Sequence, residues 1–210
     1  MSYHDALTGL YNRTFFEQEI KRLECKKRAQ ETDNRPTGII ICDVDGLKLV
    51  NDMLGHDRGD FLLTEAAKII NSVFLEKCLV ARIGGDEFAV LLEENEEGLL
   101  QAWQDIHHAL RLYNAQKPEL PLSISVGCAA DHLPSNLNLA FREADCNMYK
   151  EKIKQSPIAH DSIIESLMLN LDKKDLSHCR AEQIQKVFLE PTGSMKIAAT
   201  SESDSRIVKN

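Results

Sequence analysis

Acidic side chains follow two segments of the chain that could bring them together. The apolar run "TGIIICDV" at 37–44 ends in acid, which places Asp43 at the carboxyl end of an expected buried strand. In "RIGGDEFAVLL" at 82–92, Asp86 and Glu87 follow two glycines directly. If the two segments are neighbouring strands, these carboxylates converge. Carboxylates gathered without histidine or thiolate suit hard cations such as Mg²⁺, which could polarise a triphosphate during phosphoryl or nucleotidyl transfer.

Each of these residues also has a plain structural interpretation. Two acids after a turn are more often solvated than metal-bound, but Asp43 favours the metal because a buried acid without a partner is costly. Asp45 fits a turn before Gly46 as well as it fits a metal shell. Gly84 and Gly85 are expected to take the positive φ of a hairpin turn and to let a substrate lie close to the backbone.

The spacing of apolar residues predicts the elements that would position the acids. The expected elements are a helix from residue 15, a strand at 37–44, a helix at 56–74, two strands joined by the glycine turn, a helix at 97–116, a strand at 122–130, and a helix capped by Ser135 that ends near Lys152. This order predicts an α/β fold of the α+β kind, in which helices pack against a mixed sheet.

Composition and charge bound the classes of function. A chain of 210 residues with 43% hydrophobic residues can bury a full core, and a net charge of −8 argues against binding to nucleic acid. No apolar stretch approaches the roughly 20 residues of a membrane helix, so no membrane partner is expected. Six cysteines without a CxxC pair are interpreted as reduced core residues of a cytoplasmic protein.

The sequence changes character after Pro157, which predicts a domain boundary near 155–160. Residues 1–156 are expected to form the main domain, and 157–190 a helical extension that faintly resembles the opening helices of HD-type phosphohydrolase domains. Residues 191–210 are polar and expected to be disordered. The abrupt start favours a fragment of a longer protein with a regulatory domain.

Five separated stretches carry a family resemblance that spans residues 5–152. They are "DALTGLYNR" at 5–13, "DVDGLKLVNDMLGHDRGD" at 43–60, "RIGGDEF" at 82–88, "SISVG" at 123–127 and "ADCNMYKEK" at 144–152. In this order they resemble the GGDEF family of diguanylate cyclases. The resemblance implies a fold similar to nucleotide cyclases and polymerase palm domains, and a reaction that joins two GTP into cyclic di-GMP with release of two pyrophosphates. It also implies a homodimer, at least transiently, because each subunit holds one GTP.

The resemblance assigns catalytic and metal-binding roles. It implies that Mg²⁺ or Mn²⁺ is held by the carboxylates of Asp43 and Asp86 and by the backbone carbonyl of Val44. Glu87 matches the acid proposed to help deprotonate the attacking ribose hydroxyl, and Lys48 a lysine that stabilises charge in the transition state. Without the motif, Lys48 would be interpreted as a solvated surface charge.

The nucleotide contacts are implied in the same way. Asn51 and Asp60 match the pair that reads the guanine edge, although both types also cap helices. Lys152 matches a residue that contacts the terminal phosphates, with a surface lysine as the plain alternative. The backbone near Gly46 and Leu47 would cradle the triphosphate through its N–H groups.

Two departures from the family pattern affect regulation and phosphate binding. The RxxD motif of the inhibitory site is replaced at its ends by Leu75 and Cys78, so no product-inhibition site is expected. After Lys152 the chain reads "IKQSPIAHD", where the family often has a glycine and a basic residue. One phosphate contact is therefore in doubt.

Two other functions compete with an active cyclase. The first is a catalytically silent module that binds GTP or a cyclic dinucleotide and relays the event to a partner. The presence of Asp43, Asp86 and Glu87 favours the enzyme. The second is a cyclase that also accepts ATP, and Asp60 argues against it because adenine would leave that carboxylate unpaired or opposed.

Overall fold

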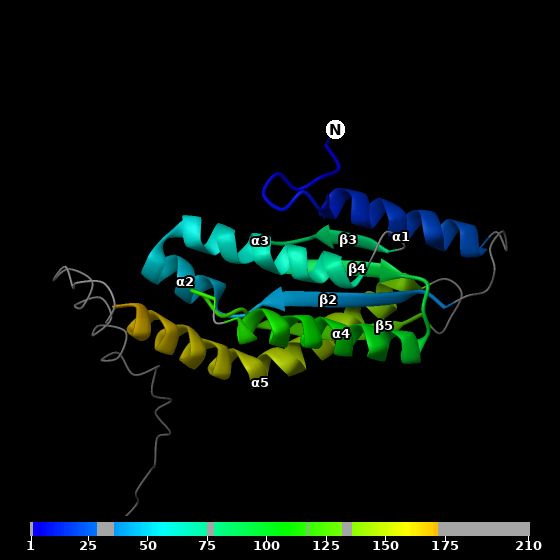
Figure 1. The fold of residues 1–210 in the computed structure, drawn as a ribbon. Helices are drawn as coiled ribbons and strands as arrows, with labels where there is room; N and C mark the ends of the chain where they lie inside the picture. The colour runs from blue at the N-terminus through cyan, green and yellow to red at the C-terminus, as the bar shows by residue number, and fades with distance from the viewer. Residues whose placement is uncertain (1, 29–35, 75–77, 117, 132–135, 172–210) are drawn as a thin grey trace, which may run out of the picture. The chain divides into compact units, whose positions relative to one another are not determined.

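The apolar run predicted as a buried strand is an interior strand of a mixed sheet (Figure 1). Strand β2 (Gly38–Val44) is buried throughout and pairs antiparallel with β4 (Glu87–Leu92) on one side and β5 (Ile124–Ala130) on the other. Strand β3 (Leu79–Arg82) pairs antiparallel with β4, and the short β1 (Tyr11–Asn12) pairs parallel with β3. The strand order is β1-β3-β4-β2-β5. This computed structural model describes residues 2–28, 36–74, 78–116, 118–131 and 136–171.

Side chains of β2 alternate between two apolar layers, as its strand geometry requires. Ile40, Cys42 and Val44 belong to a core shared with helices α2 (Leu47–Leu54), α3 (His56–Val73) and α4 (Glu96–Ala115). Ile39 and Ile41 belong to the other core, shared with α1 (Arg13–Arg28) and the first half of α5 (Leu137–Leu171). The predicted α+β fold, with helices packed against a mixed sheet, is confirmed.

Helix α5 is longer than the sequence predicted. It was expected to end near Lys152, but it passes through Pro157 and ends at Leu171. Ala159, Ile163 and Leu167 are buried at the four-residue spacing of one helical stripe, and this packing outweighs the missing N–H of the proline. The helix therefore crosses the boundary expected near 155–160. The rest of the expected extension, 172–190, and the tail at 191–210 lie outside the described residues.

Smaller predictions also need correction. The structure has two elements that were not expected, β1 and α2. Ser135, the expected cap of α5, lies outside the described residues, and the Asn136 side chain instead accepts a hydrogen bond from the Leu139 N–H at 3.2 Å. Among the described cysteines, Cys25 and Cys146 are free and exposed, so the interpretation of all six as core residues is wrong for these two. No described helix is both long and apolar enough to cross a membrane.

Gly127 fixes how closely α5 crosses β5. A Cβ added at this position would collide with the backbone of Ala144 and Met148 on α5. Gly127→Ala is therefore expected to lower the free energy of unfolding by about 1–3 kcal/mol, as other overpacked cores do, measured by urea denaturation. Gly85→Ala is the matched control, because a Cβ there meets no atom within 4 Å. Equal stability of the two variants would contradict this packing.

Candidate active site

The register between β2 and β4 brings the predicted acids to one place. Asp43 lies directly opposite Glu87 in the antiparallel pair, and the Val44 N–H donates to the Asp86 carbonyl at 3.0 Å. Asp43 and Asp86, which lie far apart in sequence, thus converge at the end of the sheet. The predicted neighbourhood of the two strands is confirmed.

Asp43 is a buried carboxylate with a basic partner. Its side chain is only 5% exposed, and the Lys152 Nζ of α5 donates to its Oδ1 at 2.6 Å. Burial is the main cause that raises the pKa of Asp43 to about 6; the Lys152 hydrogen bond opposes the increase, and the nearby charge of Asp86 adds to it. Burial lowers the pKa of Lys152, but its bond to Asp43 outweighs this effect and leaves that pKa raised. Lys152, predicted to contact the terminal phosphates, is therefore bound to the predicted metal ligand Asp43 in this structure.

The donor set suits a hard cation bound together with a substrate. Asp43 and Asp86 supply oxygen ligands, and their mutual repulsion would be relieved by a cation. In the part of the chain that the structure describes, no group of three or more His, Cys, Asp or Glu side chains is arranged to hold a metal. Mg²⁺ fits two carboxylates because it keeps several waters and commonly completes its coordination with substrate phosphates. The residues present therefore fit the metal that the resemblance implies.

The glycine hairpin is built differently from the prediction. Neither Gly84 nor Gly85 has the expected positive φ, which among the described glycines is found at Gly9, Gly46 and Gly55. Gly84 instead lies against the Glu87 side chain, so a Cβ there would displace the Glu87 carboxylate.

Gly85 leaves space for a ligand at the hairpin, and Arg82 holds the hairpin backbone in place. The space over Gly85 is open to 4 Å, which leaves room for a ligand against the backbone. Arg82 Nη2 donates to the Gly85 carbonyl at 2.6 Å, and its Nη1 donates to Asp5 Oδ1 at 3.2 Å. Arg82 thus holds the hairpin in position and links it to the N-terminal turn.

Asp45 is a structural acid rather than a free ligand. It is 1% exposed, and the hydroxyls of Ser123 and Ser125 each donate to it at 2.8 Å. Burial raises its pKa, and these two hydrogen bonds oppose the rise. Its backbone N–H also donates to the Ser123 carbonyl at 3.0 Å. The segment that follows β2 is therefore tied to the start of β5.

The segment predicted to cradle phosphates opens the unexpected helix α2. Gly46 has φ 74°, in the left-handed region that favours glycine, and precedes Leu47, the first residue of the helix. Gly46 has no side chain that could accept from the first N–H groups of the helix, and a helix N-terminus attracts anions. Lys48, in the same turn, is exposed.

The predicted guanine-reading residues lie on adjoining helices. Asn51 on α2 turns its Oδ1 toward Gly59 of α3, where a Cβ would collide with it. This oxygen is buried, and no described residue donates a hydrogen bond to it. Asp60, the next residue along α3, is exposed. The structure thus places Asn51 beside the backbone that carries Asp60.

Similarity to known proteins adds independent evidence. Residues 2–156, most of the chain, match the family described as "Diguanylate cyclase, GGDEF domain". The chain belongs to this GGDEF family. It is 33% identical over 163 residues to "Probable diguanylate cyclase DgcC" of Escherichia coli, covering 72% of this chain and 41% of that protein. It is 34% identical over 157 residues to "Diguanylate cyclase TpbB" of Pseudomonas aeruginosa, covering 72% and 35%. The chain thus spans well under half of these curated relatives.

A solved GGDEF domain supports the same fold. The structure of a truncated TpbB from Pseudomonas aeruginosa, comprising only its GGDEF domain, matches with a TM-score of 0.61 and 32% identity. The match covers 72% of this chain and 89% of the solved one. The fold expected from the resemblance is therefore confirmed.

Two features of this GGDEF chain escaped the sequence prediction. The Lys152–Asp43 contact joins residues 109 positions apart, which no local pattern reports. The contact of α5 with Gly46 depends on a helix that was expected to have ended. Of the two positions that replace the inhibitory RxxD motif, Leu75 lies outside the described residues and Cys78 is partly buried beside β3.

Proposed function

We propose that this chain is a diguanylate cyclase that condenses two GTP into cyclic di-GMP with release of two pyrophosphates. The observation that carries the proposal is the β2–β4 register, which places Asp43 opposite Glu87 and beside Asp86. These are the residue types that nucleotidyl transfer needs at one point: metal-binding carboxylates and a potential general base.

Each of the predicted site residues has a defined task in this mechanism. Asn51 and Asp60 bind guanine: the Asn51 amide NH₂ donates to an acceptor of the base, and the Asp60 carboxylate accepts from its N–H groups. The backbone at Gly46 and Leu47 holds the triphosphate. Asp43 and Asp86, with the Val44 carbonyl, hold Mg²⁺ or Mn²⁺, which when bound neutralises charge on the phosphates. Lys48, exposed in the first turn of α2, stabilises charge in the transition state.

The chemical step needs two copies of the chain. Glu87 takes the proton from the ribose 3′-hydroxyl, whose oxygen forms a bond to the α-phosphorus of the GTP on the other subunit. The bond from that phosphorus to the bridging oxygen of the β-phosphate breaks, and pyrophosphate leaves with the electron pair. The same exchange in the opposite direction closes the ring. Most of the acceleration comes from positioning and electrostatics.

One observation favours a second function, a silent nucleotide-binding module. The Lys152 ammonium contacts the Asp43 carboxylate at 2.6 Å, where an enzyme needs a metal. A cyclase would have to move Lys152 from Asp43 to the phosphates when metal and GTP bind. A silent module would keep this ion pair.

A direct assay separates these functions. The full chain is incubated at high concentration with Mg²⁺ and GTP, ATP or both, and the products are identified by mass. Cyclic di-GMP from GTP is expected, with a rate per subunit that increases with protein concentration because the active form is a dimer. A sample fused to a dimerising segment should be active at lower concentration. If both samples bind GTP but make no cyclic dinucleotide, the chain is a silent module.

Metal binding should depend on pH through Asp43. Its raised pKa, about 6, means that protons compete with the cation below that pH. We expect millimolar Mg²⁺ to increase the Tm at pH 7.5 and to lose this effect as the pH falls through about 6. Without metal, we expect the stability of the folded state to change with pH in the opposite direction. The folded state loses stability as pH rises through about 6, because Asp43 ionises less readily when folded than when unfolded.

Thermal unfolding with and without Mg²⁺, from pH 5 to 8, measures both effects. The control is Asp43→Asn, which removes the titrating carboxyl and should remove the pH dependence of the Mg²⁺ effect. A Mg²⁺-dependent increase in Tm that is equal at pH 5 and pH 7.5 would contradict the assignment of Asp43.

A further inference from the structure

The continuation of α5 lies against the predicted phosphate cradle. A Cβ built on Gly46 would stand 2.6 Å from Ile163 Cδ1 and 3.5 Å from His160 Cδ2. Ile163 is 2% exposed and belongs to the core that also contains Val44 and Val50, on either side of Gly46. The helix beyond Pro157 is therefore part of the surroundings of Gly46 and Leu47.

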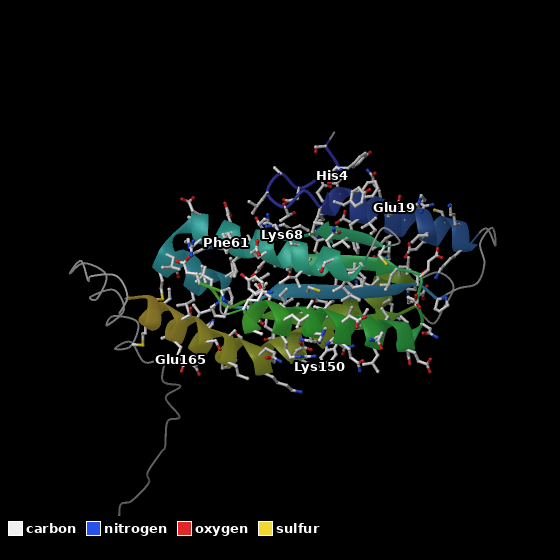
Figure 2. The ribbon with its side chains drawn as sticks, viewed as in Figure 1. His4, Glu19, Phe61, Lys68, Lys150 and Glu165 are labelled. Carbon is white, nitrogen blue, oxygen red and sulfur yellow. The ribbon has the colours of Figure 1, made fainter. Side chains whose placement is uncertain are left out.

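Core packing fixes this part of the helix. Ala159 and Leu167 are buried on the same stripe as Ile163, at 5% and 8% exposure. The Ser166 hydroxyl donates to the Glu119 carbonyl at 2.7 Å, which ties the next turn to the segment before β5. The position of His160 beside Gly46 thus follows from buried neighbours on both sides of it in sequence. Figure 2 shows the outer face of the same helix, where the labelled Lys150 and Glu165 point away from the sheet.

The helix runs alongside the segment that carries the predicted metal and phosphate sites. Lys152 contacts Asp43 at the end of β2, and His160, about 12 Å further along at 1.5 Å per residue, lies at Gly46. One face of α5 therefore passes from the metal site to the triphosphate cradle. His160 is the imidazole on that path, and it is exposed.

We propose that His160 binds the β- and γ-phosphates of the nucleotide beside the Gly46–Leu47 backbone. The proposal rests on the proposed function, because it assumes that a nucleoside triphosphate occupies this cradle. An imidazole N–H donates to a phosphate oxygen when neutral and adds a positive charge when protonated. Such a group is useful where Asp43, Asp86 and Glu87 would otherwise repel the triphosphate. It would also supply the phosphate contact that is in doubt because the chain reads "IKQSPIAHD" after Lys152.

Binding measurements on the full chain test this role without turnover. The probes are GMP and a GTP analogue with a non-hydrolysable link between the α- and β-phosphates, titrated calorimetrically with Mg²⁺ present. His160→Ala is expected to lower the affinity for the analogue about tenfold and the affinity for GMP much less. A factor of about ten corresponds to the loss of one charge-assisted hydrogen bond at an exposed position. His160→Lys should restore most of the affinity for the analogue.

Controls separate this role from a structural one. His108→Ala removes an exposed histidine from α4 and should leave both affinities unchanged. The Tm of His160→Ala should match that of the parent chain, since the residue is exposed. If the parent chain binds the analogue and His160→Ala binds it equally well, or if the variant loses the same factor for GMP, the role of His160 is refuted and the cyclase proposal is not. If the parent chain binds neither probe, both proposals fail.

Discussion

Asp86→Asn is expected to lower the rate of cyclic di-GMP formation by at least about 10²-fold while the protein remains folded. Asp86 is a partly buried residue at the hairpin, and its charge raises the pKa of Asp43 beside it. The amide has almost the same shape as the carboxylate but lacks the negative charge that would hold the cation. The cation would then bind weakly, and the charge on the α-phosphate would lack its main stabilisation in the transition state.

The measurement is the initial rate of product formation from GTP at saturating Mg²⁺, with the product identified by mass. Asp105→Asn is a matched control, because this aspartate is exposed on α4 and accepts a hydrogen bond from Gln101 of the same helix. It should retain the parent rate. Far-UV circular dichroism and Tm confirm that both variants fold. A rate for Asp86→Asn within threefold of the parent would exclude Asp86 as an essential metal ligand.

The parts of the fold that could be predicted from sequence are those with strong periodicity. The apolar run of β2, the helical stripe of α3 and the segments on either side of the glycine pair each carry a pattern that local geometry explains. The convergence of Asp43 with Asp86 and Glu87 followed from one further assumption, that the two strands are neighbours. The register bears it out.

The rest depends on contacts between distant parts of the chain. Helix α2 has eight residues and follows a left-handed glycine, so its short pattern does not separate it from a loop. The continuation of α5 was missed because proline normally ends a helix, and only the core that Ile163 and Leu167 enter shows why Pro157 does not.

The role of Gly84 and Gly85 could also not be predicted from the sequence. Glycine suits a positive φ, but neither residue has one: Gly84 lies against the Glu87 side chain, and Gly85 leaves open space. Only side-chain placement distinguishes these reasons. In the same way, a lysine assigned to phosphate could not be seen to contact Asp43.

Asp60→Ala is expected to lower the preference for GTP over ATP by about 10- to 100-fold while cyclase activity remains measurable. A carboxylate accepts from the N1–H and amino groups of guanine, whereas adenine presents an acceptor at N1. Asp60 is exposed at the start of α3 and therefore free to meet a base. Asn51 turns its amide oxygen toward Gly59, which leaves the amide NH₂ to donate to an acceptor of guanine.

The ratio of kcat/KM for the two nucleotides measures this preference, and Asp57→Ala is the matched control. Asp57 is an exposed acid in the first turn of the same helix, so it shares the helix-end electrostatics of Asp60. If loss of negative charge near the helix start were the cause, both variants would change kcat/KM for GTP and ATP by the same factor and leave the ratio unchanged. A changed ratio in Asp60→Ala alone requires contact with the base, because the two nucleotides differ only there. An unchanged ratio in Asp60→Ala would refute its role in reading guanine.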